Sequence, residues 1–225
     1  MASRDNAFSP AVEDYAKAIY QLGERAGGAV STTALAERLA VTAASASGMV
    51  RKLDELGLVA HVPYRGVELT ARGVRLALEV LRHHRLLELY LAEDLGVPWD
   101  RVHDEAEVLE HYISEDLERL IAKKLGDPSH DPHGDPIPNA ELDIAEGTTL
   151  PLTELSPGDA ATFERVSDRD SEMLRYLGRR GIHPGVDMVL RAREPFDGPL
   201  FVEVQGSEHV LGHRLAQAMR VSRAR

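Results

Sequence analysis

Four side chains that can bind divalent cations recur at helical spacing within residues 102–112, VHDEAEVLEHY. At relative positions 0, 4, 7 and 8, they are His103, Glu107, Glu110 and His111. A helix would carry all four on one stripe. Apolar residues flank the stripe, and buried carboxylates and imidazoles are costly unless they pair or hold a metal ion. The pattern therefore predicts either a metal site or a solvated face with Glu–His pairs.

A second pair of candidate ligands lies upstream, where HHRLLE places His84 and Glu88 four residues apart. Taken alone, such a pair is an ordinary feature of a helix surface. If the helix that carries it packs against residues 102–112, we expect His84, Glu88 and His103 to form one cluster. The other three residues of the stripe would form another. Asp14 would join only if the predicted first helix meets the same face, and it would otherwise be exposed.

The elements that would position these residues begin with a helical pattern over residues 9–28. This pattern starts at a Ser-Pro pair and ends at two glycines. Residues 31–57 predict two short helices joined by a tight turn, and residues 58–70 predict a β-hairpin that turns at 64–66. This order is typical of a winged helix-turn-helix domain, although an ordinary helical hairpin would show the same two helices.

The second of these short helices carries residue types that suit DNA. It starts with small polar side chains, which let a helix lie close in the major groove, and continues with basic ones that reach phosphates. An arginine at the hairpin tip suits a phosphate or minor-groove contact. The expected DNA contacts are Thr42, Ser45, Ser47, Arg51, Lys52 and Arg65. Lys17, on the first helix, is expected to add a phosphate contact.

The remaining chain divides into a helical part, a proline-rich loop and a β-rich part. Helical periodicity continues over residues 70–124 in stretches longer than a usual helix, which leaves room for a break. Residues 126–150 are rich in proline and predict a loop, in which His130 and His133 are expected to be solvated. From residue 152 onward, short apolar runs alternate with glycine and proline turns, as in a small β-barrel.

Together these patterns predict a mainly α protein with β structure, built in three parts. We expect a winged helix-turn-helix domain at residues 1–75, a helical domain at 76–145 and a small β-barrel domain at 146–225.

Composition and charge narrow the class of protein. The chain has 225 residues and a net charge of −11, which alone disfavours a nucleic-acid partner. Residues 1–75, however, hold nine basic and eight acidic residues, so the negative excess lies in the rest of the chain. The absence of cysteine excludes disulfides and thiolate metal sites. No run is long and apolar enough for a membrane span and no export signal is present, so we expect a cytoplasmic protein that does not bind membranes.

The segment VHDEAEVLEHYISEDLE, with HHRLLE before it and GDPIP after it, resembles the diphtheria toxin repressor family of metal-dependent transcriptional repressors. The resemblance covers essentially the whole chain. It implies a winged helix-turn-helix domain, a helical domain for dimerisation and metal binding, and a C-terminal SH3-like domain of the FeoA type. It also implies a homodimer that binds operator DNA when loaded with metal and controls genes of metal uptake and homeostasis.

The same resemblance implies two sets of metal ligands. The primary site would consist of Asp14, Glu107, Glu110 and His111. The second would consist of His84, Glu88 and His103, completed from the C-terminal domain by Glu164 and Asp168. The iron-sensing branch of the family has Met and Cys where this chain has Asp14 and Glu107, so the chain resembles the manganese-sensing, MntR-like branch. That branch also uses a glutamate where this chain has Lys17, so its paired-manganese arrangement is not expected here.

The donor set agrees with manganese as the cofactor. Because Mn²⁺ binds nearly every site more weakly than its competitors, selection has to come from donor type, and oxygen donors without sulfur favour it. Fe²⁺ is the alternative, and Co²⁺, Zn²⁺ and Cd²⁺ are expected to substitute in vitro. The rival class is a carboxylate–histidine metalloenzyme that activates water or oxygen. The chain lacks both Glu-x-x-His and His-Glu-x-x-His, so we do not expect an enzyme.

Overall fold

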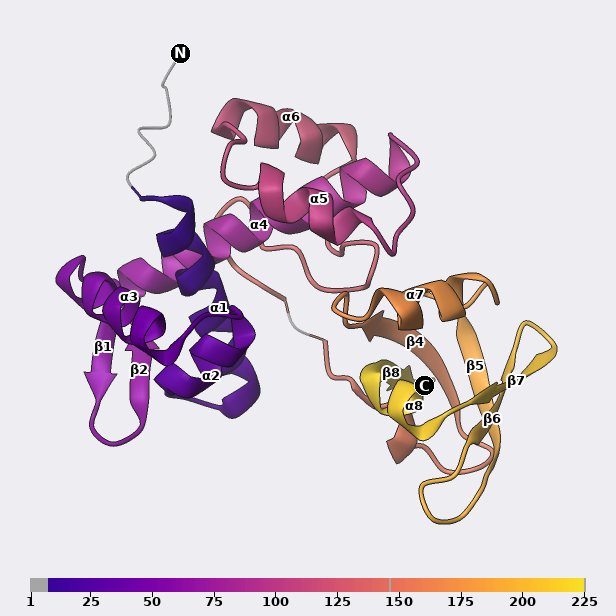
Figure 1. Ribbon diagram of the computed structural model, residues 1–225. Coiled ribbons are helices and arrows are strands. Elements are labelled where there is room, and N and C mark those ends of the chain that lie inside the picture. The colour runs from indigo at the N-terminus through magenta and orange to yellow at the C-terminus, as the bar shows by residue number, and fades with distance from the viewer. Residues whose placement is uncertain (1–7, 146, 225) are drawn as a thin grey trace. The chain divides into compact units, whose positions relative to one another are not determined.

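The computed structural model describes residues 8–145 and 147–224, which separate into two compact units (Figure 1). The first unit comprises residues 8–84, 107–124 and 138–143, and the second comprises 85–106, 125–137, 144–145 and 147–224. Helices α4 (Ala71–Glu93) and α5 (Val102–Leu109) each contribute residues to both units. Each unit is described by itself.

The first unit starts with the predicted winged helix-turn-helix domain. Its elements are α1 (Pro10–Ala26), α2 (Thr32–Arg38), α3 (Ala43–Glu55), β1 (Val59–Val62) and β2 (Gly66–Leu69). Ser31 and Thr42 cap the second and third helices, since each side chain accepts a hydrogen bond from a backbone N–H of its own first turn. Gly27 ends the first helix in the left-handed conformation, with φ at 68°. The three helices fall within the ranges predicted from the sequence, residues 9–28 and 31–57.

The hairpin of this domain is held to the helices by a close backbone approach. Strands β1 and β2 pair antiparallel, and Val30 adds a short bridge to Val67. At Gly66, a Cβ atom would lie 2.0 Å from the carbonyl oxygen of Val30, and φ is 122°. Only glycine fits that position. A buried apolar cluster, which includes Ile19, Leu35 and Leu53, joins the helices to the hairpin.

The helical region settles one point that the sequence left open and departs from the prediction at another. Helix α4 runs unbroken over 23 residues. The predicted ligand stripe, in contrast, is wrong beyond Leu109, where α5 ends and Glu110 and His111 form a turn. A new helix, α6 (Glu115–Lys124), begins after Ser114, whose Oγ accepts a hydrogen bond from a backbone N–H of its first turn. Because the helix breaks here, the apolar period read through the segment does not mark a single buried face.

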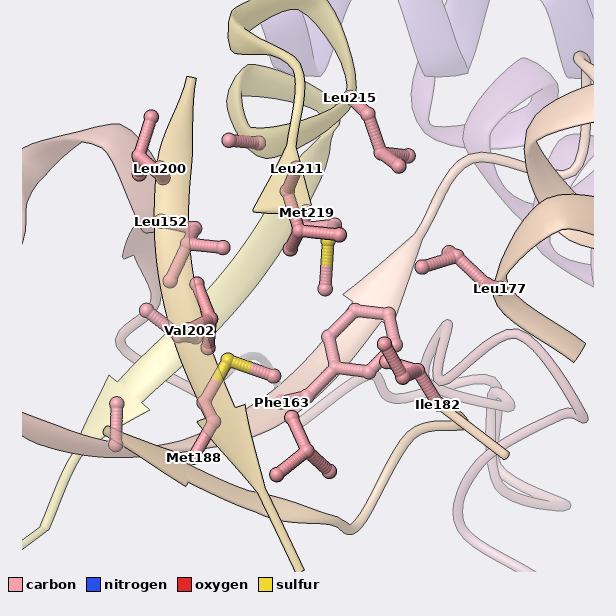
Figure 2. Close-up of a cluster of buried hydrophobic side chains, with 14 of the residues drawn as sticks. Leu152, Phe163, Leu177, Ile182, Met188, Leu200, Val202, Leu211, Leu215 and Met219 are labelled. Atoms are coloured by element: carbon pink, nitrogen blue, oxygen red, sulfur yellow. The ribbon is translucent and has the colours of Figure 1, made fainter. Parts of the chain in front are cut away.

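The second unit contains the predicted C-terminal β-domain. Its elements are β3 (Leu150–Pro151), η1 (Leu152–Glu154), β4 (Ala160–Val166), α7 (Ser171–Gly178), β5 (Asp187–Arg193), β6 (Leu200–Val204), β7 (Ser207–Leu211), α8 (His213–Ala218) and β8 (Met219–Arg223). The strands form one antiparallel sheet in the order β3-β8-β4-β5-β6-β7. Register shifts in β4 and β5 increase the local twist of this sheet. Alternate side chains of the strands point into one core, in which Phe163, Met188 and Met219 lie together (Figure 2).

Candidate functional site

In the first unit, helix α1 brings Asp14 to the turn that carries Glu110 and His111. We call Asp14, Glu110 and His111 the first centre. His111 Nε2 lies 3.0 Å from Asp14 Oδ1 and 3.6 Å from Glu110 Oε1. Glu110 is fully buried, and His84 Nδ1, on α4, lies 2.5 Å from its Oε2 atom. Two helices and one turn that are far apart in the sequence therefore meet around one buried carboxylate.

Glu13 supports the first centre from behind, and the sequence did not single it out. This glutamate is buried, and its Oε2 atom lies 2.6 Å from His111 Nδ1. A carboxylate on the far nitrogen is the usual way of fixing the ring of a metal-binding histidine. Burial lowers the pKa of His111, but the neighbouring carboxylates of Asp14 and Glu13 outweigh it and raise that pKa to about 9. Its position next to Asp14, beside the buried stripe of α1, is the only signal in the sequence that points to Glu13.

The predicted phosphate contact of Lys17 is wrong. The side chain is 4% exposed, so it cannot reach DNA. Its Nζ atom donates hydrogen bonds to Glu110 Oε1 at 2.6 Å and to Glu107 Oε1 at 2.8 Å. Burial lowers the pKa of Lys17, but the charges of Glu110 and Glu107 raise it more, so the net shift is upward. Glu107, a predicted primary ligand, is thus held by the lysine at the edge of the first centre.

The donors of the first centre fit a divalent cation. One ligand atom from each of Asp14, Glu110 and His111 lies within 4.8 Å of the others. In the part of the chain that the structure describes, Asp14 Oδ1 is a buried acceptor that makes no hydrogen bond of good geometry. Two carboxylates and an imidazole, without sulfur, suit Mn²⁺ or Fe²⁺.

In the second unit, a second centre forms around His103. It consists of Glu88, His103 and Asp168, of which Asp168 lies just after β4. His103 Nδ1 lies 3.3 Å from Glu88 Oε1 and 3.0 Å from Asp168 Oδ2. The Glu164 carboxylate instead accepts a hydrogen bond from Ser222 on the neighbouring strand. Of the two C-terminal candidates, the structure brings Asp168 to His103. His84, which was expected beside Glu88, belongs to the first unit.

The loop at residues 131–136 packs behind Glu88, and the expectation that His133 is solvated is wrong. His133 is fully buried, and its Nε2 atom lies 2.7 Å from the carbonyl oxygen of Trp99. Its Nδ1 atom faces Glu88 Oε2 at 3.7 Å. Burial lowers the pKa of His133, but the facing carboxylates of Glu88 and Asp131 outweigh it and raise that pKa to about 9. His130, by contrast, is exposed as expected.

A third ionic cluster surrounds Glu118, and protein side chains supply its hydrogen-bond partners. Glu118 on α6 accepts hydrogen bonds from Arg82 Nε at 2.5 Å, and His83 Nε2 lies 2.9 Å from its other oxygen. Burial raises the pKa of Glu118, but the bonds from His83 and Arg82 outweigh it and the net shift is downward. Because protein donors satisfy this carboxylate, the cluster has the character of a structural ion network.

The predicted DNA contacts are exposed residues of the winged domain. Along α3 and at the hairpin tip, all six are exposed: Thr42, Ser45, Ser47, Arg51, Lys52 and Arg65. Thr42 also caps the start of α3 by accepting a hydrogen bond from the backbone N–H of Ser45, and the two hydroxyl oxygens lie 2.9 Å apart. The surface therefore combines a closely approachable helix face with basic residues at the helix end and at the wing.

Within residues 8–145 and 147–224, no helix is both long and apolar enough to cross a membrane.

Three family matches cover most of the chain. Residues 7–67 match the family described as iron dependent repressor, N-terminal DNA binding domain. Residues 70–139 match the iron dependent repressor, metal binding and dimerisation domain, and residues 150–223 match the FeoA domain.

Individual proteins align over nearly the full length. The chain is 33% identical over 226 residues to the iron-dependent repressor IdeR of Mycobacterium leprae, which covers 94% of this chain and 96% of the relative. It is 32% identical over 222 residues to the diphtheria toxin repressor of Corynebacterium glutamicum, covering 94% and 95%. A solved structure of a manganese-dependent transcriptional repressor in complex with manganese has 44% identity and a TM-score of 0.88, over 95% of this chain and 100% of that chain.

The fold expected from the sequence is thereby confirmed as a DNA-binding domain, a dimerisation and metal-binding domain and a C-terminal FeoA domain. Proteins with this combination are repressors that bind DNA as metal-loaded dimers, and they are not enzymes. The chain belongs to the diphtheria toxin repressor family of metal-dependent transcriptional repressors.

Proposed function

We propose that this protein is a Mn²⁺-dependent repressor in which the first centre controls DNA binding. The observation that carries the proposal is the position of Asp14. It lies on the first helix of the winged domain, yet its carboxylate meets Glu110 and His111 from the turn after α5. A ligand set shared between these two segments couples metal binding to the orientation of the winged domain.

The charges and positions of the side chains in the first centre would produce this coupling. Asp14 and Glu110 would hold the ion through carboxylate oxygens, and His111 through Nε2. A bound divalent cation supplies the positive charge that lets these carboxylates stay close together. Glu13 keeps Nδ1 of His111 engaged, which leaves Nε2 directed toward Asp14. We expect a coupling free energy of about 1 to 3 kcal/mol, which corresponds to ~5- to 150-fold in operator affinity.

We assign the second centre to Glu88, His103 and Asp168, with His84 and Glu164 as further candidates. Glu88 and His103 lie on the helical region and Asp168 on the C-terminal domain, within the same unit. Metal there would brace the FeoA domain against the end of α4. The proposal also includes the division of the chain into a winged helix-turn-helix domain at residues 1–75, a helical domain at 76–145 and a C-terminal domain at 146–225.

Operator DNA is proposed to bind along α3 and the wing. The exposed small residues Thr42, Ser45 and Ser47 permit close approach to the major groove, and the basic side chains of this surface reach phosphates. Two copies would present two such helices to half-sites one or more helical turns apart. Because its partner is DNA, we place the protein in the cytoplasm and expect it to control genes of metal uptake and homeostasis.

An exposed apolar face is available for the dimer. On α5, α6 and the turn between them, the large apolar side chains exposed to solvent are Val108, Leu109, Tyr112, Leu117 and Leu120. Exposed large apolar side chains gathered on neighbouring elements are expected to mark an interface. We propose that a second copy of the chain covers it, beside the first centre that α5 and its turn help to build.

Manganese is favoured over iron because the centres contain oxygen and nitrogen donors only. The matched structure with 44% identity is a manganese-dependent repressor, which supports the same choice. The iron-dependent relatives make Fe²⁺ the alternative. With either ion, the coupling through Asp14 would be the same.

The proposal is tested by titrating the full chain onto a fragment of its own promoter at fixed salt, with Mn²⁺, Fe²⁺, Co²⁺ or Zn²⁺ or without metal. Salt has to be held constant because phosphate contacts make DNA affinity strongly salt-dependent. We expect Mn²⁺ to tighten binding by ~5- to 150-fold at the lowest free metal concentration. Equal DNA affinity with and without every metal would overturn the proposal, and a preference for Fe²⁺ would overturn the choice of metal alone.

A further inference from the structure

A second group of donors adjoins the first centre and already contains a cation. Glu107, Glu110 and His84 place one ligand atom each within 4.8 Å of one another. Lys17 extends from α1, three residues after Asp14, and its ammonium donates to both carboxylates of this group. At 2.6 Å from Glu110 Oε1 and 2.8 Å from Glu107 Oε1, these are short, charge-assisted bonds.

Burial makes this lysine a fixed part of the site. Its side chain is buried, as is Glu110, so movement of the ammonium into solvent would leave the buried Oε1 atom of Glu110 without its ammonium donor. Two carboxylate oxygens within hydrogen-bonding distance stabilise the charged form of the ammonium. The position between the two carboxylates is therefore occupied by the positive charge of Lys17.

We propose that Lys17 is a built-in cation that takes the place of a second metal ion between Glu107 and Glu110, so that the first centre binds one divalent ion and not two. This inference rests on the proposed metal-binding role of the first centre and adds a determinant of its stoichiometry. It also implies that α1 is tied to the end of α5 before any metal arrives, because Lys17 spans the two segments.

The charge of the site agrees with one ion. Glu13, Asp14, Glu107 and Glu110 supply four negative charges, and Lys17 supplies one positive charge. With neutral imidazoles, one divalent ion leaves a single net negative charge. Replacing Lys17 by glutamate makes five carboxylates, and a single net negative charge then requires two divalent ions.

The test counts Mn²⁺ ions in the full-length chain. Glu88→Ala and His103→Ala together remove two of the three donors of the second centre and provide the parent protein. In this parent we introduce Lys17→Glu, and separately Arg25→Glu as the matched control. Arg25 lies exposed in the last turn of the same helix, so the control makes the same charge change away from the site. Equilibrium dialysis gives the number of bound ions, and electron paramagnetic resonance shows whether two ions share ligands.

We expect one Mn²⁺ per chain, with the hyperfine-split signal of an isolated ion, in the parent and in Arg25→Glu. Lys17→Glu should bind two ions whose signals are lost through exchange coupling. If Lys17→Glu does not fold, as judged by circular dichroism, Lys17→Gln keeps the test open. Its neutral amide oxygen removes the charge and can act as a ligand, so it should also admit a second, weaker ion.

Two outcomes would overturn the inference and leave the proposed function intact. One is a parent that already binds two coupled ions, because the lysine would then move aside. The other is a folded Lys17→Glu and a folded Lys17→Gln that each still bind a single ion. A parent that binds no ion would instead refute the first centre as a metal site, and this inference with it.

Discussion

In the first unit, a lysine ammonium lies among the carboxylates of the first centre. In the second unit, the carboxylate of Glu88 is surrounded differently, by the imidazoles of His103 and His133. Asp131, behind it, lies 3.9 Å from the guanidinium of Arg85, and burial together with the charges of Glu88 and Asp135 raises the pKa of Asp131. The same donor types thus stand in two electrostatic settings: a lysine bridges two carboxylates in the first unit, and two imidazoles face one carboxylate in the second.

The settings also differ in what they connect. The first centre joins the DNA-binding domain to the segment that carries the exposed apolar face, whereas the second joins α4 and α5 to the end of β4. From this difference we expect the first centre to govern DNA affinity and the second to govern the attachment of the C-terminal domain. Four experiments can break or sharpen that division of roles.

The largest expected effect is that of Asp14→Ala. Removing this ligand should abolish the metal-dependent part of DNA affinity, a loss of ~5- to 150-fold in the presence of Mn²⁺, while affinity without metal stays as in the unaltered protein. Promoter-fragment titration measures both. Glu24→Ala on the exposed side of the same helix is the matched control and should retain full stimulation. Undiminished stimulation in Asp14→Ala would show that the first centre does not control DNA binding.

The second-largest effect is expected from His103→Ala, which should weaken Mn²⁺ binding at the second centre. Fluorescence of Trp99, the only tryptophan in the sequence, measures this binding. Trp99 stacks on His133, with ring centroids 5.7 Å apart, so its fluorescence reports on the surroundings of Glu88. Because even outer-shell partners are worth ~10- to 100-fold in metal affinity, loss of this ligand should shift Mn²⁺ quenching of Trp99 by at least about 10-fold.

Two controls accompany the tryptophan experiment. His130→Ala removes an exposed histidine of the neighbouring loop and should leave the quenching curve in place. Asp14→Ala should leave it in place as well, because Asp14 belongs to the first centre. If Asp14→Ala moved the curve as far as His103→Ala does, the two centres would not be separate.

A smaller effect is expected from Glu118→Gln, which tests the complete ion cluster beside the centres. Loss of the charged partner of Arg82 and His83 should lower the free energy of unfolding by about 1 to 3 kcal/mol at pH 7, without changing Mn²⁺ binding. The pKa of Glu118 is depressed in the folded protein, so its contribution is present above the unfolded pKa of roughly 4.3 and is lost as pH falls through the folded value.

Urea denaturation at several pH values follows this contribution. The difference between wild type and Glu118→Gln should be full at neutral pH and disappear in acid. Asp116→Asn, which alters an exposed ion pair with Arg119 on the same helix, should change stability by less than about 1 kcal/mol. A constant difference at every pH would mean that packing, and not charge, explains the loss.

The smallest effect is expected from Glu164→Gln. Its carboxylate accepts a hydrogen bond from Ser222, which an amide oxygen can also accept, so Mn²⁺ affinity at the second centre should change by no more than about 0.5 kcal/mol. Asp168→Asn should weaken the same binding measurably, since Asp168 lies 3.0 Å from His103. If a Mn²⁺ titration followed by Trp99 fluorescence showed a larger loss of affinity in Glu164→Gln than in Asp168→Asn, Glu164 would be the ligand.

The fold was predictable where its determinants are local. The Ser-Pro pair and Gly27 bound α1, and Ser31 and Thr42 cap the helices of the helix-turn-helix, each through groups within a few residues in the chain. The break after Leu109 was missed because the apolar period continues through it. Only the start of α6 at Ser114 shows that the chain begins a new helix.

The candidate site was predictable only in its residue types. Asp14, Glu110 and His111 were expected together, and the structure brings them together. Glu13 was missed and Lys17 was assigned the wrong contact because their partners His111 and Glu110 lie 98 and 93 positions away along the chain. His133 was misjudged for the same reason, since the carbonyl of Trp99 that it contacts belongs to a distant segment.

The sequence by itself determined the donor inventory of this protein: carboxylates and imidazoles without sulfur, at helical spacing behind a winged helix-turn-helix domain. Those properties follow from residue identity and from short-range geometry. The tertiary structure alone decided which donors meet, which of them are satisfied by protein groups, and that Lys17 faces inward. The physical reason is that desolvation and Coulomb interaction depend on distances between segments that the chain order does not specify.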